Sequence, residues 1–287
     1  MRNVDEHTIT EAVLERVCQA PGARARAIGE ALVRHLHAFV REIEPTQAEW
    51  QAAIEFLTRA SAFCSDTRQE FILLSDVLGV SMLVDAINHR LPGAATQTTV
   101  LGPFHVQDAP EHALGDDISA GMQGEPLLVE GTVSRLDGTP IAGALIDTWH
   151  ADAEGYYDVQ REAGLDGLAG RARLRTDAEG RFWFRSIVPS SYPVPNDGPA
   201  GDLLKAQGRH PFRPAHVHFM IGAPGCETLV THVFLDGDRY LDSDAVFGVK
   251  DALIKRLEQQ PAGITARGNR VDAPMAALRY DFVLADA

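Results

Sequence analysis

The chain has 287 residues, of which 26 are Lys or Arg and 40 are Asp or Glu, so its formal charge is −14. This length allows one large core or two modest ones, and the 45% of hydrophobic residues excludes a disordered or fibrous protein. An acidic field repels phosphate backbones, so no nucleic acid is expected as a partner.

The sequence shows no targeting or membrane-spanning signal. Its N-terminus lacks a basic stretch followed by an apolar one, and no run approaches the roughly 20 apolar residues that a spanning helix needs. We therefore expect a cytoplasmic protein without membrane contact. Cys18, Cys64 and Cys226 are odd in number and form no CxxC pair, which predicts free thiols rather than disulfides or a zinc knuckle.

Helical periodicity dominates the N-terminal part of the chain. Apolar residues at three- and four-residue steps form one stripe: Ile28, Leu32, Leu36, Phe39 and Ile43. Trp50, Ile54 and Leu57 repeat the pattern beyond Pro45. An amphipathic stripe needs a partner surface, and we expect these helices to form a domain of their own over residues 1–95.

Start and stop signals delimit these helices. Thr8 with Glu11 and Thr46 with Glu49 have the spacing of capping boxes, in which a hydroxyl satisfies a free N–H of the first turn. The apolar stretch from Phe71 to Ile87 is long enough for a further helix, and a Pro-Gly pair at 92–93 ends it.

Beyond residue 125 the pattern changes to short runs of β-branched and aromatic residues between turns, which is typical of an antiparallel β-sandwich. Strands are predicted at 127–134, 144–149, 173–176, 181–187, 215–222, 229–235 and 279–284. Asp137-Gly138 is a hairpin signal, and 177–180 is a longer turn. The Pro- and Gly-rich segment 188–214 has no period and is a candidate wall of a site. The predicted fold is mainly β with α, a catalytic sandwich over 96–287 after the helical domain.

Two histidines in the strand 215–222 are the first candidates for chemistry. The period of two in a strand sends His216 and His218 to the same face, where two imidazoles provide half of a metal site. A metallo-β-lactamase-like hydrolase would need Asp at position 220, which is Met220, and a cupin would need a carboxylate near Gly222. Other donors must therefore complete a site, and tyrosine phenolates become worth considering, although spacing alone does not select them.

Four segments of the chain resemble the intradiol ring-cleavage dioxygenases and occur in that family's order. They are Leu101-Gly-Pro-Phe104, Gly155-Tyr-Tyr157, the stretch from Val188 through Tyr192 to Pro199, and the stretch from Gly208 through Arg213 to His218. Within the family, Tyr192-Pro-Val-Pro-Asn-Asp-Gly-Pro199 and the stretch from Asp242 to Lys250 are most similar to hydroxyquinol 1,2-dioxygenases.

The resemblance implies an Fe(III) ion held by Tyr157, Tyr192, His216 and His218, with a solvent-derived hydroxide. Tyr192 would also act in catalysis by leaving the iron and accepting a substrate proton. Arg213 would face the substrate ring and stabilise developing negative charge. His232 stands where catechol-cleaving relatives commonly have Gln, and the resemblance makes it a hydrogen-bond donor behind the ligands.

The same resemblance predicts a mostly apolar pocket for an aromatic diol or triol. Its lining would be Leu73, Asp76, Val100, Leu101, Gly102, Pro103, Phe104, Val194, Pro195, Arg213 and Val246. Asp76 is the exception among the apolar residues, and we hypothesise that its carboxylate accepts a hydrogen bond from the third hydroxyl of hydroxyquinol, benzene-1,2,4-triol. Relatives also form homodimers through the N-terminal helices, often with a bound phospholipid.

The expected activity is therefore cleavage of hydroxyquinol by O₂ to 3-hydroxy-cis,cis-muconate or its tautomer maleylacetate, in the catabolism of aromatic compounds. Catechol or chlorocatechol is the alternative substrate. A β-sandwich binding module of the prealbumin kind is a more remote alternative, because Gly131-Thr-Val and Thr176-Asp-Ala-Glu-Gly180 also resemble such modules. A metal-dependent hydrolase is disfavoured by the absence of carboxylate ligands.

Overall fold

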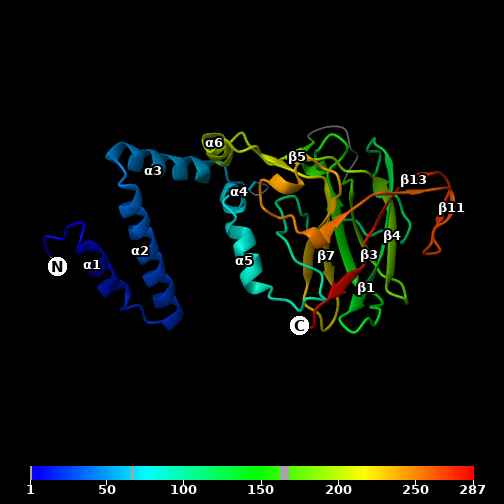
Figure 1. Cartoon of the computed structure of the whole chain (residues 1–287), viewed down its shortest axis with the longest axis horizontal. Helices are drawn as coiled ribbons and strands as arrows, with labels where there is room; N and C mark the ends of the chain where they lie inside the picture. Colours follow the sequence, from blue (N-terminus) through cyan, green and yellow to red (C-terminus); the bar gives the residue numbers. More distant parts are fainter. Residues whose placement is uncertain (1, 66–67, 162–167) are drawn as a thin grey trace. The chain divides into compact units, whose positions relative to one another are not determined.

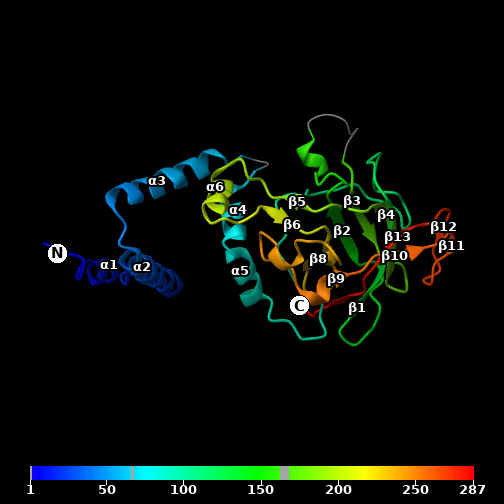
Figure 2. The same ribbon diagram turned by 45° about the horizontal axis from the view of Figure 1, so that its top comes forward.

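The computed structural model describes residues 2–65, 68–161 and 168–287. The chain forms two compact units, Met1–Arg59 and Ala60–Ala287. Figures 1 and 2 show the helices of the first unit and the strand-rich second unit in two views. The domain boundary expected near residue 95 stays a prediction, and the compact units themselves divide earlier in the chain. None of the described helices is long and apolar enough to cross a membrane.

The first unit contains α1 (Ile9–Val17) and α2 (Ala23–Ile43), and α3 (Gln47–Ala62) begins in it. The two first helices pack together, and Thr10 Oγ1 lies 3.0 Å from His37 Nδ1 between them. The α2 stripe predicted from the sequence is helical, yet none of the residues of α2 is buried. The apolar face of α2 therefore has no cover within its own unit.

One of the two predicted capping boxes forms. Glu49 N–H donates to Thr46 Oγ1 at 3.2 Å, and Thr46 N–H donates to Glu49 Oε2 at 2.8 Å, which confirms the second box. The first box was wrong, because the hydroxyl of Thr8 donates to Asp5 Oδ1 at 2.7 Å and makes no cap bond to α1. The hydroxyl oxygen of Thr8 accepts instead from Asp5 N–H at 2.9 Å, and the carboxylate of Asp5 accepts from Thr8 N–H at 2.9 Å, so the two residues cap the turn that precedes α1.

The described residues of the second unit also form the α-helices α4, α5 and α6. The stretch predicted as one helix is two, α4 (Glu70–Val77) and α5 (Val80–Asn88). Gly79 separates them with φ of +72°, a left-handed conformation that glycine adopts without steric cost. The segment 188–214, predicted to lack regular structure, contains α6 (Pro199–Ala206), whose Pro199 occupies the favoured first position and whose Leu204 is buried.

The strands of the second unit form two main sheets. The first has the order β10-β13-β1-β14 with β4 beside β1, and the second has the order β3-β2-β7-β8-β9. The bounds in the first sheet are β1 (Pro126–Arg135), β4 (Arg181–Ile187), β10 (Glu258–Gln260), β13 (Met275–Arg279) and β14 (Phe282–Leu284). In the second they are β2 (Leu145–His150), β3 (Arg171–Arg175), β7 (His216–Gly222), β8 (Leu229–Leu235) and β9 (Ile254–Lys255).

Short elements complete the unit. They are the strand pairs β5 (Tyr192–Pro193) with β6 (Phe212–Arg213) and β11 (Gly263–Ile264) with β12 (Arg270–Val271), and the 3-10 turns Asp158–Gln160, Leu241–Ser243 and Asp251–Leu253. The predicted strands are present within two residues of their expected bounds, except that 279–284 contains the end of β13 and all of β14. Asp137-Gly138 closes a short hairpin, as predicted: Ser134 and Pro140 form an antiparallel bridge, and Ile141 N–H donates to the carbonyl oxygen of Val133 at 2.9 Å. The strands β1 and β2 on either side of this hairpin belong to different sheets.

The core lies between the two main sheets. From the second sheet, Val217, Phe219 and Ile221 of β7 are fully buried in it, together with Leu127, Phe182 and Phe282 of the first sheet. Most strand pairs are antiparallel, and β1 pairs in parallel with β13 and β14. Because side chains alternate along β7, His216 and His218 point to the opposite face of the sheet, away from this core.

Candidate metal centre

Two imidazoles of β7 lie side by side on the outer face of the second sheet. His216 and His218 are both buried, and their Nε2 atoms are 3.1 Å apart. The Nδ1 of His216 lies 2.7 Å from the carbonyl oxygen of Pro214, so this nitrogen carries the proton and the Nε2 lone pair points into the site. Two ring nitrogens this close repel unless a proton or a cation lies between them.

Two tyrosines from separate loops bring their hydroxyls to the same place. Tyr157 follows β2 directly before the Asp158–Gln160 turn, and Tyr192 belongs to β5, paired with Arg213 of β6. Tyr157 Oη is 2.9 Å from His218 Nε2 and 3.3 Å from Tyr192 Oη. The structure therefore brings together the four side chains that the sequence predicted as metal ligands.

The electrostatics of these groups suit a cation. Burial lowers the pKa of both His216 and His218 well below the usual value, which keeps the imidazoles neutral with lone pairs free to donate. Burial, with Tyr192 close by, raises the pKa of Tyr157 well above its usual value. A buried phenol of this kind ionises only when a positive charge replaces its proton, as a metal ion does.

The spacing of the donors fits one metal ion. Side-chain donors that share a first-row ion at about 2.0–2.2 Å lie about 3 Å from one another. The separations of 2.9, 3.1 and 3.3 Å among the four donor atoms match this value. Oxygen and nitrogen donors without thiolates favour a hard or borderline ion such as iron over a soft one.

A third histidine packs against the pair. His232 lies directly opposite His218 in the register of β7 and β8, with ring centroids 4.2 Å apart, and it is fully buried. Its Nδ1 makes a short contact with the hydroxyl of Thr99, while its Nε2 has no hydrogen-bond partner among the described residues. The three imidazoles also form a cluster that could hold a metal, but His218 Nε2 lies 2.9 Å from Tyr157 Oη, and His216 Nε2 lies 3.1 Å from His218 Nε2.

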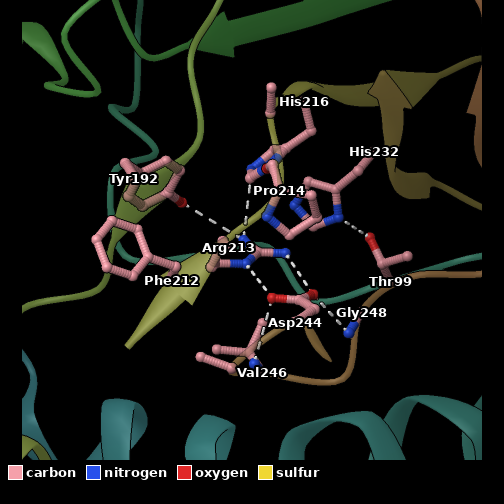
Figure 3. A network of polar contacts seen from close by, with 12 residues as sticks. Thr99, Tyr192, Phe212, Arg213, Pro214, His216, His232, Asp244, Val246 and Gly248 are labelled. Carbon is pink, nitrogen blue, oxygen red and sulfur yellow. Dashed lines mark hydrogen bonds and ion pairs between the residues drawn. The ribbon is translucent and has the colours of Figure 1, made fainter. Parts of the chain in front are cut away.

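Arg213 is buried. It lies beside two of the four donors, Tyr192 and His216 (Figure 3). Its Nη1 is 3.5 Å from Tyr192 Oη and 3.4 Å from His216 Nε2. Burial disfavours its charge, but the carboxylate of Asp244 outweighs this and raises the pKa of Arg213 above its usual value. A permanent cation therefore stands beside the position where a bound molecule would contact Tyr192.

Some of the residues predicted to line the substrate pocket lie together in the structure. Phe104 stacks on Tyr157 at 4.4 Å between ring centroids and, with Val194 and Pro195, lines a pocket of about 430 Å³. Gly102 has φ of +80°, and a Cβ there would lie 3.1 Å from His218 Cε1, so only glycine allows this approach.

The other predicted wall residues are more dispersed. Leu73 and Asp76 of α4 and Val246 are buried but are not among the residues that line this pocket. Leu101 is 40% exposed, and Val100 is partly buried. Burial raises the pKa of Asp76; Ser81 and Arg213 act in the opposite direction, and Asp244 adds to the rise. Asp76 is thus within electrostatic reach of Arg213.

Sequence reasoning missed several supports of the site. Arg171 and Asp158 form a fully buried ion pair, and Arg171 Nη1 donates to the carbonyl oxygen of Phe104 at 3.0 Å, which links the Tyr157 turn to the Phe104 loop. Trp149 of β2 stacks on His218 at 4.6 Å. Asp158 adjoins Tyr157 in the sequence and could have drawn notice, whereas the pairing of Trp149 with His218 depends on strand register.

Histidines outside the donor set pair with polar side chains from other parts of the chain. His150 Nε2 is 2.7 Å from Ser186 Oγ, and His105 Nε2 is 3.1 Å from Asp147 Oδ2. His210 Nε2 is 2.9 Å from Ser243 Oγ.

Comparisons with known proteins cover nearly the whole chain. A family model described as "Dioxygenase" matches residues 100–286, and one described as "Catechol dioxygenase N terminus" matches residues 22–96. A 6-chlorohydroxyquinol 1,2-dioxygenase of Cupriavidus pinatubonensis is 55% identical over 99% of both chains. The solved hydroxyquinol 1,2-dioxygenase of Pseudomonas putida has a TM-score of 0.91 and 45% identity, over 98% of this chain and 99% of that one. The solved catechol 1,2-dioxygenase of Pseudomonas arvilla has a TM-score of 0.81 and 32% identity, over 98% and 93%.

Proposed function

The chain belongs to the intradiol ring-cleavage dioxygenases, and we propose that it cleaves hydroxyquinol with O₂ between two neighbouring hydroxyl-bearing carbons. The product would be 3-hydroxy-cis,cis-muconate or its tautomer maleylacetate. Higher identity to relatives named for hydroxyquinols than to the catechol enzyme of Pseudomonas arvilla supports the triol over catechol or chlorocatechol. Family membership leaves no reason for a prealbumin-like binding module or a hydrolase.

The observation that carries the proposal is the convergence of Tyr157, Tyr192, His216 and His218. The family uses non-haem iron, and we propose that these four residues hold it as Fe(III), because two anionic oxygen donors stabilise the ferric state. When bound, the iron supplies Lewis acidity toward the oxygens of the diol.

The chain's own residues would perform the remaining tasks. Tyr192 Oη accepts a proton from a substrate hydroxyl, since it lies at the edge of the donor set beside Arg213. Arg213 stabilises negative charge that develops on the ring, because its guanidinium is desolvated and permanently charged. Phe104 and Val194 provide apolar surface that excludes water from the ring.

His232 would support the imidazole pair from behind. Thr99 fixes one side of its ring, and its free Nε2 is buried, so the residue can donate a hydrogen bond on that side. This is the role that we propose for it in place of the Gln of catechol-cleaving relatives.

Oxygen uptake tests the proposed function directly. The purified iron-loaded protein should consume O₂ with hydroxyquinol faster than with catechol or a chlorocatechol at equal concentration. Absence of uptake with every diol would contradict the activity. Faster turnover of catechol would contradict only the choice of substrate.

Asp76 is the proposed determinant of that choice. Its buried carboxylate would accept a hydrogen bond from the third hydroxyl of the triol, and a hydrogen bond to a charged group contributes about 1.5–3 kcal/mol. Asp76→Ala should therefore lower kcat/KM for hydroxyquinol by about 10- to 100-fold and leave catechol little changed. Leu73→Ala, one turn away on the same helix, is the matched control, because it removes wall area without a polar group. An unchanged ratio of the two substrates in Asp76→Ala would show the hypothesis to be wrong.

The N-terminal helices would serve assembly. We propose that the uncovered apolar stripe of α2 forms a homodimer and also offers a place for a phospholipid chain, since Ile28, Leu32 and Phe39 are each more than half exposed. Leu32→Glu should shift the sedimentation of the protein toward the monomer, and mass spectrometry of organic extracts would detect lipid. A monomeric wild-type protein would contradict the dimer.

A further inference from the structure

Asp244 is a buried carboxylate that forms an ion pair with Arg213. Its Oδ1 lies 3.1 Å from Arg213 Nε and its Oδ2 lies 3.4 Å from Arg213 Nη2, and both side chains are almost completely buried. This arrangement occupies one edge of the guanidinium with a two-point contact. The remaining Nη1 then points toward Tyr192 and His216, as Figure 3 shows.

The same carboxylate also holds the loop that follows it. Gly248 N–H donates to Asp244 Oδ2 at 2.9 Å, and Val246 N–H donates to Asp244 Oδ1 at 3.3 Å. Between them, Phe247 has φ of +60°, a left-handed conformation that is unusual for a bulky residue and persists only where surrounding contacts enforce it. One side chain therefore fixes both Arg213 and the loop that carries Val246.

Gly248 closes this arrangement from the other side. A Cβ at this position would lie 3.1 Å from Arg213 Nη2 and 3.2 Å from Asp244 Oδ2, tighter than ordinary van der Waals contact. Its backbone conformation is not left-handed, so alanine is tolerated by the backbone and would only crowd the ion pair. The absence of a side chain at residue 248 therefore lets the loop approach the pair without displacing it.

We propose that Asp244 is a positioning residue that orients Arg213 toward the ring of the bound substrate, with Gly248 allowing the loop to close over the pair. The inference rests on the proposed function, because the task of Arg213 is stabilisation of charge on the ring. Among the described residues, the side-chain hydrogen bonds of Asp244 go to Arg213 and to the backbone of Val246 and Gly248, and not to the four donors. It acts by denying the guanidinium any other orientation, and a displacement of about 1 Å can cost about 100-fold in rate.

A double-mutant cycle between positions 213 and 244 tests the proposal. Asp244→Asn keeps the shape of the side chain but removes its charge, and we expect kcat for hydroxyquinol to fall about 10- to 100-fold with KM changed less than about 3-fold. In an Arg213→Gln background the same substitution should change kcat less than about 2-fold, because there is no guanidinium left to orient. Losses that multiply in the double variant would overturn the proposal.

A second variant allows the proposal to be tested even if Asp244→Asn misfolds. If Asp244→Asn does not fold, Gly248→Ala displaces the pair while retaining both charges, and we expect kcat to fall about 3- to 10-fold with the visible absorption of the iron-loaded protein retained. Glu130→Gln is the matched control, since Glu130 is equally buried and pairs with Arg279 in the other sheet. A folded Gly248→Ala variant with wild-type kcat would overturn the proposal.

If the proposed function itself is wrong, the experiments give a different result. In that case the wild-type protein would cleave no diol at all. Coupling between positions 213 and 244 would then appear only in the unfolding free energy, which the wild-type protein and the three variants of the cycle report through urea denaturation. An active wild-type protein without coupling in kcat would refute the positioning role alone.

Discussion

The two faces of β7 have different roles, because one packs in the core between the sheets and the other carries the imidazoles of the candidate site. Val217, Phe219 and Ile221 face the other sheet and are surrounded by apolar side chains. His216 and His218 alternate with them and face the loops that carry the tyrosines. Adjacent residues of one strand thus belong to different environments, because each successive side chain of a strand points to the opposite face.

The rigid apolar face of β7 holds its polar face in place. The inner side chains are close-packed and resist displacement. The backbone that carries the outer imidazoles is therefore held in a fixed position. Trp149 on the neighbouring strand also restrains His218 by stacking on its ring. Substitutions on the inner face should therefore affect stability, and substitutions on the outer face should affect metal binding and catalysis.

The largest effect is expected for His218→Ala on the outer face. Removal of one proposed ligand should abolish iron retention and reduce turnover by more than the roughly 10- to 100-fold that loss of an outer hydrogen-bond partner costs. The metal-free variant should still show a cooperative unfolding transition. Iron content after gel filtration and oxygen uptake measure the two effects. Full iron occupancy in His218→Ala would show that His218 is not needed to hold the metal.

Phe219→Ala, at the next position, should lower stability and leave iron binding and turnover nearly unchanged. Phe219 is fully buried and its ring lies 4.8 Å from that of Phe282, so truncation should lower the unfolding free energy by about 3–5 kcal/mol. Iron content and kcat per folded molecule should stay near wild type at low temperature. Urea denaturation measures the loss, and a change below about 1 kcal/mol would be inconsistent with a close-packed inner face.

His232 separates metal binding from the other roles of outer-face residues, because it lies on the outer face without being a proposed ligand. His232→Ala leaves the Thr99 hydroxyl without its partner and should destabilise the protein by about 1–3 kcal/mol. His232→Gln retains a hydrogen-bonding side chain, and we expect activity within about 3-fold of wild type. Loss of iron from His232→Gln would instead indicate that the three-histidine cluster holds the metal.

The smallest effect is expected for a polar group outside the site. Burial raises the pKa of Asp281, but hydrogen bonds from Arg267 and Thr132 outweigh it and hold that pKa below its usual value. A lowered pKa stabilises the fold above the unfolded-state pKa, and this contribution disappears as the pH falls through the folded-state pKa. Because Asp281 is largely exposed, Asp281→Asn should cost less than about 1 kcal/mol at pH 7. It should also flatten the acid limb of the stability profile, and an unchanged limb would contradict the assignment.

Much of the fold could be predicted because periodicity is local. The alternation in β7 predicted that His216 and His218 share a face, and the stripe of α2 predicted a helix. The division at Gly79 was missed because a single glycine does not by itself show that its backbone is left-handed. Residues 188–214 were predicted without a helix because the prolines and glycines hid the short apolar repeat of α6.

The candidate site was less accessible to sequence reasoning. Tyr157 and Tyr192 are 35 residues apart and were selected only by their resemblance to family motifs, since spacing gives no signal across loops. Asp244 was missed because its contact with Arg213 spans 31 residues and depends on how the loop after β8 folds back. Long-range contacts of this kind arise from tertiary packing, which no local pattern encodes.

The central claim is that Tyr157, Tyr192, His216 and His218 hold a single ferric ion, and visible absorption of the purified protein tests it most directly. We expect iron in nearly equal amount to protein, with a broad visible band from charge transfer between tyrosinate and Fe(III). The band should shift when hydroxyquinol is added without oxygen, and Tyr157→Phe should weaken or displace it. A colourless protein that cleaves the triol at full rate, or a band that Tyr157→Phe leaves unchanged, would contradict the account.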